Sequence, residues 1–106
     1  MLKDISVSEL ARWRDEQKDF VLLDVREPGE VATAAIPGAL VMSMRTVPAR
    51  LHELPKDRPI AVLCHHGGRS FQVARFLQAQ GFADVVNVDG GIDAYAAQID
   101  RTIPRY

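Results

Sequence analysis

The segment CHHGGRS, residues 64–70, holds the only cysteine of the chain, and histidine, glycine and arginine residues follow it at once. The thiolate is the nucleophilic form of cysteine, so a reactive cysteine needs a pKa below the ordinary value. His65, His66 and Arg69 place potential positive charge beside Cys64, and a helix that begins just after the turn would add unpaired amide N–H groups. This combination indicates a cysteine nucleophile that attacks a small anion.

Gly67 and Gly68 occupy the middle of this turn. Glycine reaches positive φ without strain and has no side chain, so successive amides can turn inward and form an anion-binding nest. A cup of amides around a thiolate fits the chemistry indicated for Cys64. The turn lacks the GxxxxGK[ST] pattern of a nucleotide-binding P-loop, so its glycines do not predict that function.

Two structural alternatives exist for the same residues. A lone cysteine at the end of a buried strand is often a small core hydrophobe, but a Gly-Gly turn that leads into a helix favours a reactive thiol. Cys64, His65 and His66 are also potential metal ligands. Adjacent residues rarely face one metal ion, and His52 is the only other histidine of the sequence. We therefore predict no metal site and no cofactor.

Short apolar segments alternate with amphipathic segments along the chain. The pattern predicts strands over residues 20–25, 39–42, 59–64 and 84–88, and helices beginning at the capping box SVSE (6–9), over 28–35, 45–54 and 69–81, and around Ile92, Tyr95, Ala96 and Ile99. Phe71, Ala74 and Leu77 form the predicted inner face of the 69–81 helix, which Gly81 is placed to end. This alternation is typical of a largely parallel sheet that helices cover on both faces.

Three groups of polar residues follow the predicted strands. Cys64 ends one strand, Asp24 and Arg26 end another, and residues 89–91 follow a third. The carboxyl ends of the strands in open α/β sheets gather ligands, so we expect these groups to share one rim. Asp24 and Arg26 are predicted to support that rim as ordinary exposed strand ends, with no direct part in the chemistry.

The composition narrows the class of protein. A chain of 106 residues suits one domain, which we place over residues 1–106. The formal net charge of −1 gives no reason to expect binding to nucleic acid or to an anionic membrane. No apolar run approaches the ~20 residues of a membrane helix, and the N-terminal segment lacks the long apolar region of a signal peptide. We expect a cytoplasmic protein, and the sequence leaves its oligomeric state open.

Three motifs, placed in order along nearly the whole chain, are similar to those of the rhodanese-like sulfurtransferase domains: LLDVREPGE (22–30) followed by IPGA (36–39), then CHHGGRS (64–70), then VDGGIDAY (88–95). The chain departs from that family at two places. Ala34 and Ala35 stand where the family often has Gly-His, and Tyr95 stands where tryptophan is common. We interpret both departures as structural, with Tyr95 in the core.

This resemblance implies a rhodanese-like three-layer α/β/α domain with a central, mainly parallel five-stranded sheet. It also implies that Cys64 attacks the outer sulfur of an anionic donor such as thiosulfate, carries that sulfur as a persulfide and passes it to a thiol or protein acceptor. The amides from His65 to Ser70 would hold the persulfide and the charge of the donor. One of the imidazoles of His65 and His66 lines the pocket mouth, or both are simply exposed; Arg69 either steers the donor or stabilises the loop, and we favour the second role.

Other functions share parts of this pattern. Phosphatases of the same fold have five residues between cysteine and arginine, whereas four separate Cys64 from Arg69, so phosphate or arsenate chemistry is not predicted. Non-enzymatic binding modules of the family often lack the cysteine that this chain keeps. A sulfur carrier that receives its persulfide from a partner protein needs the same thiolate, so the sequence does not separate it from a thiosulfate enzyme.

Overall fold

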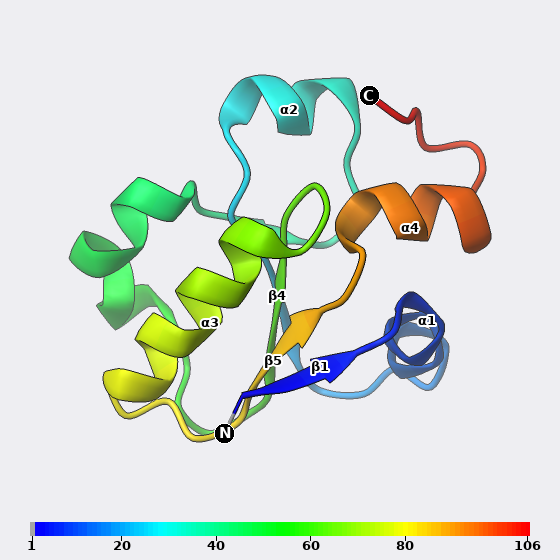
Figure 1. Ribbon diagram of the computed structural model, residues 1–106. Helices are drawn as coiled ribbons and strands as arrows, with labels where there is room; N and C mark the ends of the chain where they lie inside the picture. Colours follow the sequence, from blue (N-terminus) through cyan, green and yellow to red (C-terminus); the bar gives the residue numbers. More distant parts are fainter. Residues whose placement is uncertain (1) are drawn as a thin grey trace.

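A computed structural model describes residues 2–106 as five parallel strands with helices on both faces of the sheet (Figure 1). The strand order is β1-β5-β4-β2-β3. The strands are β1 (Lys3–Ile5), β2 (Val21–Asp24), β3 (Leu40–Val41), β4 (Ile60–Leu63) and β5 (Val85–Val88). The helices are α1 (Val7–Asp15), α2 (Pro28–Thr33), the 3-10 helix η1 (Met44–Glu53), α3 (Gly68–Ala79) and α4 (Gly91–Gln98). The predicted α/β/α class with a five-stranded parallel sheet is confirmed.

Two apolar layers lie on opposite faces of the sheet. Along β4, Ala61 and Leu63 belong to one core cluster, whereas Ile60 and Val62 belong to the other, because successive side chains of a strand point to opposite faces. The first cluster includes buried residues of α1 and α4, and the second includes buried residues of α3 and η1. β4 is therefore covered on both sides, as its uninterrupted apolar sequence predicts.

The helices of residues 2–106 are short, and none of them is both long and apolar enough to cross a membrane. Ser6 caps α1 as predicted, since its hydroxyl accepts a hydrogen bond from the Glu9 amide at 3.1 Å. Gly81, at φ +93°, follows α3 in the left-handed conformation that ends many helices. Tyr95 of α4 is buried in the core, in agreement with the prediction.

Some elements differ from the sequence prediction. Residues 45–54 lie mostly within the 3-10 helix η1, because Pro48 has no amide hydrogen to donate and Arg50 leaves helical geometry at φ −119°. The pattern also misses β1, whose three residues are too few to show alternation. Phe71 is predicted on the inner face of α3, but it is 39% exposed. Val73 is buried in the core in its place.

Asp24 and Arg26 form a buried ion pair at the carboxyl end of β2. Both residues have 0% of their surface exposed, so the expectation of ordinary exposed strand ends is wrong. Arg26 Nη2 lies 2.6 Å from Asp24 Oδ2, and Arg26 Nε donates to Asp24 Oδ1 at 3.0 Å. Arg26 Nη1 also donates to the Glu30 carbonyl oxygen of α2 at 3.3 Å. The spacing of two residues lets the guanidinium fold back onto the carboxylate, and the pair joins β2 to α2.

We expect Arg26→Met to lower the free energy of unfolding by about 3–5 kcal/mol, because it leaves the Asp24 carboxylate buried without a partner. The matched control is Arg45→Met, which removes an exposed guanidinium 3.5 Å from Glu27 and should cost less than about 1 kcal/mol. Urea denaturation of both variants measures the difference. Equal losses in the two variants would contradict the assignment of Asp24 and Arg26 as a buried framework.

Candidate active site

Cys64 follows β4 directly, and residues 64–70, here called the cysteine loop, lead from the sheet into α3. Cys64 is 1% exposed, and the Gly67 amide donates a hydrogen bond to its sulfur at 3.1 Å. The chain returns to the sulfur within three residues because Gly67 adopts φ +114°, a conformation that other residues rarely reach. Gly68 has no positive φ and begins α3, so only one of the two predicted glycines has the predicted conformation.

Hydrogen bonds to the sulfur oppose the effect of burial on Cys64. Burial raises the pKa of a thiol, but the Ser70 hydroxyl and the amides of Ser70, Gly67 and His66 favour the thiolate, so the pKa of Cys64 lies below its ordinary value. The direction agrees with the sequence prediction. Most of these donors are backbone amides at the start of α3, where helix N–H groups have no partner within the helix.

Asn87 of β5 connects the cysteine loop to the sheet. The Ser70 hydroxyl donates to Asn87 Oδ1 at 2.5 Å, and Asn87 Nδ2 donates to the Gly67 carbonyl oxygen at 3.3 Å and to Asp4 Oδ1 at 3.1 Å. Ser70 has a single hydroxyl proton, so its bond to Asn87 competes with any bond to the Cys64 sulfur. The amides of Ser70, Gly67 and His66 are therefore the donors to the Cys64 sulfur that do not compete with the bond to Asn87.

The turn after β5 packs directly against the cysteine loop. The Ile92 amide donates to the Cys64 carbonyl oxygen at 2.9 Å, and the Asp93 amide donates to the His65 carbonyl oxygen at 3.1 Å. A Cβ on Gly91 would collide with the same two carbonyl oxygens, and Gly91 has φ +60°. The predicted common rim of the β4 and β5 ends is present, and Gly91 permits the close approach of α4 to the loop.

Arg69, in the first turn of α3, forms a bidentate ion pair with Glu30 of α2. Its Nη1 and Nη2 atoms lie 2.7 and 2.9 Å from Glu30 Oε1 and Oε2. The Arg69 guanidinium holds the pKa of the Glu30 carboxyl well below its usual range, and the carboxylate in turn raises the pKa of Arg69. Because a carboxylate already faces the guanidinium, the geometry favours a structural role for Arg69 over the steering of an anionic donor.

The two histidines of the loop have different surroundings. The His65 ring packs against His66, with centroids 3.8 Å apart, and stacks on Tyr106, with centroids 3.9 Å apart and planes inclined by 6°. Desolvation and repulsion by His66 lower the pKa of His65, so this imidazole carries a positive charge less readily than an ordinary histidine. The His66 side chain is 67% exposed, and its Nε2 lies 3.9 Å from Asp93 Oδ2.

His65, His66 and Asp93 each place one potential ligand atom within 4.8 Å of the others. Asp93 already binds Arg105, whose Nε and Nη2 atoms lie 3.0 and 3.1 Å from its two carboxylate oxygens. This guanidinium holds the pKa of the Asp93 carboxyl below its usual value, and it would repel a divalent cation at the same oxygens. We interpret the cluster as an ion-pair network at the edge of the loop.

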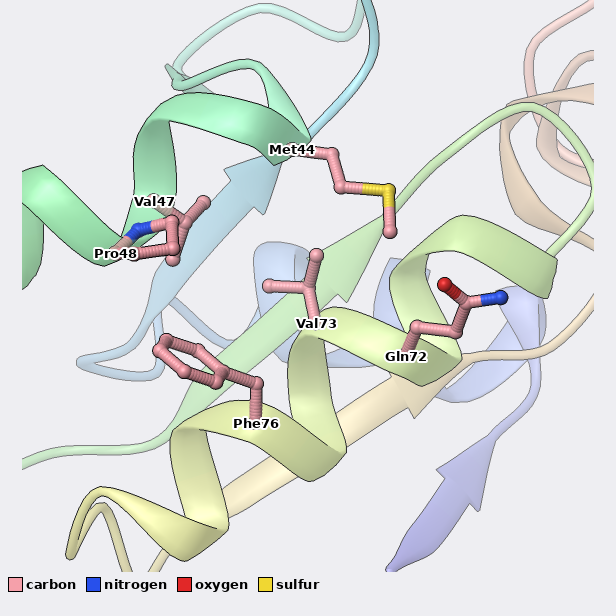
Figure 2. A pocket seen from close by; sticks show the side chains of 6 residues that line it. All are labelled: Met44, Val47, Pro48, Gln72, Val73 and Phe76. Carbon is pink, nitrogen blue, oxygen red and sulfur yellow. The ribbon is translucent and has the colours of Figure 1, made fainter.

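An apolar pocket lies between η1 and α3, away from the Cys64 sulfur. Its lining consists of Met44, Val47, Pro48, Gln72, Val73 and Phe76. Figure 2 shows Met44 reaching from η1 toward α3, with Gln72 and Phe76 along that helix. Since α3 begins in the cysteine loop, the Gln72 end of the pocket is the end nearer to the loop. Cys64 does not line this pocket, so the pocket is distinct from the immediate surroundings of the cysteine sulfur.

Several residues that shape the site are not predicted from the sequence. Glu30 lies within a recognised motif, but a glutamate on a short surface helix looks like an ordinary solvated residue. Asn87 is the only polar residue in the apolar strand β5, VVNV, which is a usable signal. Tyr106 gives no local signal at all, because its contacts with His65 and Glu30 join segments far apart in the sequence.

The parallel sheet with helices on both faces defines an α/β domain, and at the carboxyl edge of that sheet lies a buried cysteine whose sulfur accepts a hydrogen bond from the Gly67 amide. Comparison with known families gives a more specific result. The family described as "Rhodanese-like domain" matches residues 6–98. The chain belongs to the rhodanese-like domain family.

Individual relatives extend this result. The chain is 38% identical over 96 residues to a protein named sulfurtransferase from Allochromatium vinosum, covering 91% of this chain and 90% of that one. It is 33% identical over 103 residues to the thiosulfate sulfurtransferase GlpE of Pseudoalteromonas translucida, covering 97% of each chain. The crystal structure of a rhodanese-like domain protein from Staphylococcus aureus matches with a TM-score of 0.86 at 33% identity, over 99% of both chains. These relatives support a sulfurtransferase of the rhodanese type.

The two loop glycines should respond differently to alanine. Gly67→Ala should lower the free energy of unfolding by about 1–2 kcal/mol, because alanine is strained at φ +114° and its Cβ would lie 3.4 Å from the Gly90 nitrogen. The Cβ added by Gly68→Ala would meet nothing within 4 Å. This variant should match or exceed the wild-type stability, since alanine is more favourable than glycine in a helix by about 1 kcal/mol. Urea denaturation compares them, and similar losses for both would contradict the proposed backbone requirement.

The depressed pKa of Cys64 should appear in its alkylation rate. We expect the rate of modification by iodoacetamide, plotted against pH, to have a midpoint below the ~8.5 of a free thiol. The thiolate fraction at neutral pH is then higher than for an ordinary cysteine. Cys64→Ser provides the background rate from other side chains. A midpoint at or above the free-thiol value would show that burial outweighs the loop amides.

Proposed function

We propose that the protein transfers sulfane sulfur through a persulfide on Cys64, with thiosulfate or a related anionic compound as the donor. Membership of the rhodanese-like family and relatives named sulfurtransferases support this function. The single observation that carries it is the Gly67 amide at 3.1 Å from the Cys64 sulfur, within a loop whose amides favour the thiolate. A thiolate surrounded by inward-pointing N–H groups is suited to meet an anion that carries a reactive sulfur.

The first step of the proposed reaction forms a bond between the Cys64 sulfur and the outer sulfur of thiosulfate. The bond between the two thiosulfate sulfurs breaks, and its electron pair leaves with sulfite. One sulfur–sulfur bond replaces another, so the total charge and the number of electrons are unchanged. Amides that favour the negative charge of the thiolate also suit the persulfide anion that results.

The second step returns the enzyme to its starting form. A thiolate or another thiophilic acceptor attacks the outer sulfur of the persulfide, and Cys64 leaves as a thiolate. In this proposal the amides from His65 to Ser70 bind the transferred sulfur and the donor charge. The Asp24–Arg26 and Arg69–Glu30 pairs have a different role: they fix the rim on which the loop rests.

A sulfur carrier that is loaded by a partner protein is the second candidate function. It needs the same thiolate and the same loop. Because Cys64 is 1% exposed, a thiosulfate-like donor and a protein donor would both have to reach into the cysteine loop. Donor preference separates the two functions, because a carrier should take sulfur from a protein or small-molecule persulfide much faster than from thiosulfate. The proposed compartment is the cytoplasm, where thiols stay reduced and a single cysteine can cycle between thiolate and persulfide.

Intact-protein mass spectrometry tests the persulfide directly. After incubation with thiosulfate, the wild type should gain the mass of one sulfur atom, and cyanide should remove it as thiocyanate. Cys64→Ser should gain nothing, because an alcohol at this position has no comparable nucleophilic anion at neutral pH. Addition to the Cys64→Ser variant would place the reactive group elsewhere in the chain.

The same experiment with a small-molecule persulfide as donor separates the candidate functions. Loading by thiosulfate and by the persulfide at similar rates supports the thiosulfate enzyme. Loading by the persulfide alone supports the carrier. Failure of both donors on a folded protein with an alkylatable Cys64 would overturn sulfur transfer as the function of this site.

A further inference from the structure

We propose that Tyr106 is a positioning residue that braces both ends of the cysteine loop and thereby sets the reactivity of Cys64. The proposal deepens the proposed function, because it concerns the same nucleophile. It rests on three sets of contacts: those of the Tyr106 ring, those of its hydroxyl and those that anchor the segment before it. The sequence motifs do not include this residue, and Figure 1 shows the end of the chain beside α2.

The ring of Tyr106 contacts the beginning of the loop. It stacks on His65 with centroids 3.9 Å apart and planes inclined by 6°. His65 Nε2 is buried and has no hydrogen-bond partner among residues 2–106. The Tyr106 and His66 rings both pack against this imidazole, so the stack contributes to holding its orientation. Because His65 is bonded directly to Cys64, the stack restrains the first peptide of the loop.

The hydroxyl of Tyr106 is connected to the other end of the loop. It donates to Glu30 Oε2 at 2.8 Å and accepts a hydrogen bond from Arg26 Nη1 at 3.0 Å. The same Glu30 carboxylate binds both terminal nitrogens of Arg69, at 2.7 and 2.9 Å. One side chain therefore links His65, through its ring, with Arg69, through Glu30. Two of the amides that favour the Cys64 thiolate, those of His66 and Gly67, lie between these two restraints, and the Ser70 amide follows directly after the second.

The segment before Tyr106 has its own anchors. Ile103 is buried in the core cluster that contains α4, and Arg105 forms two hydrogen bonds with the Asp93 carboxylate. Tyr106 itself is 41% exposed, so truncation of its side chain leaves no large cavity in the core. A substitution at Tyr106 should therefore change the loop while the rest of the domain stays folded.

The charged and titratable groups around the loop come from the loop and from the elements packed against it: His65, His66 and Arg69 in the loop, Asp24 at the end of β2 and Arg26 just after it, Glu30 in α2, Asp93 in α4, and Arg105 in the segment before Tyr106. Tyr106 touches three of them directly. Loss of its side chain leaves these charges in place but removes their common restraint. The expected consequence is a less ordered set of amides around the sulfur, and so a smaller fraction of thiolate at neutral pH.

The test measures the midpoint of Cys64 alkylation against pH in three variants. Tyr106→Ala should raise the midpoint by about one pH unit, which corresponds to about a ten-fold slower reaction at neutral pH. Tyr106→Phe keeps the stack and loses the bonds to Glu30 and Arg26, so it should raise the midpoint by a smaller amount. Arg101→Ala is the matched control and should leave the midpoint unchanged. Arg101 is exposed in the same C-terminal segment, and its Nε donates a hydrogen bond to the Ala97 carbonyl oxygen.

Each outcome decides the proposal. Raised midpoints in both tyrosine variants, with circular dichroism spectra equal to that of the wild type, support the brace. A wild-type midpoint in either folded variant overturns it; if Tyr106→Ala fails to fold, Tyr106→Phe alone decides. The alkylation assay needs no sulfur donor, so the effect of Tyr106 on Cys64 can be measured even if the mass experiment shows no sulfur transfer. The two proposals can therefore fail independently.

Discussion

The hydrogen bond from the Gly67 amide to the Cys64 sulfur is the interaction on which the rest of the site depends. A sulfur anion buried beside an apolar cluster is unstable unless donors replace the water that it has lost. The amides of the cysteine loop provide those donors, but only if the chain reverses within three residues of Cys64. That reversal requires the left-handed Gly67, the Asn87 side chain under its carbonyl group and the close approach of Gly91.

The charges of the loop contribute less than its residue types suggest. Desolvation lowers the pKa of His65, so its ring is less readily charged than an ordinary histidine, and Arg69 faces the carboxylate of Glu30. Neither side chain is therefore a free cation next to Cys64. The stabilisation of negative charge comes mainly from oriented N–H dipoles, which the fold fixes in place and which do not titrate. In this site, ion pairs help to hold the backbone in position, and the backbone amides stabilise the negative charge of the Cys64 thiolate.

Local patterns were enough to predict a parallel α/β sheet covered by helices and the position of Cys64 at the end of β4. The apolar run of β4, the turn after it and the amphipathic α3 are each encoded by neighbouring residues, and together they place Cys64 at the carboxyl edge of the sheet. The burial of Asp24 and Arg26, the Glu30–Arg69 pair and the position of Tyr106 depend on segments that meet only in the folded chain. Strand β1 is missed for another reason, since it gains its place by pairing with β5 and has little strand signal of its own.

If Cys64 carries a transferred sulfur as proposed, its burial also limits which molecules can reach that sulfur. Only 1% of the residue is exposed, so a sulfur atom added to it would lie within the loop and away from dissolved reductants and oxidants. The residence time of that sulfur would depend on how readily an acceptor can reach it within the loop. An acceptor able to enter the cup would gain access that bulk thiols lack, and the shape of the loop would select the destination of the sulfur.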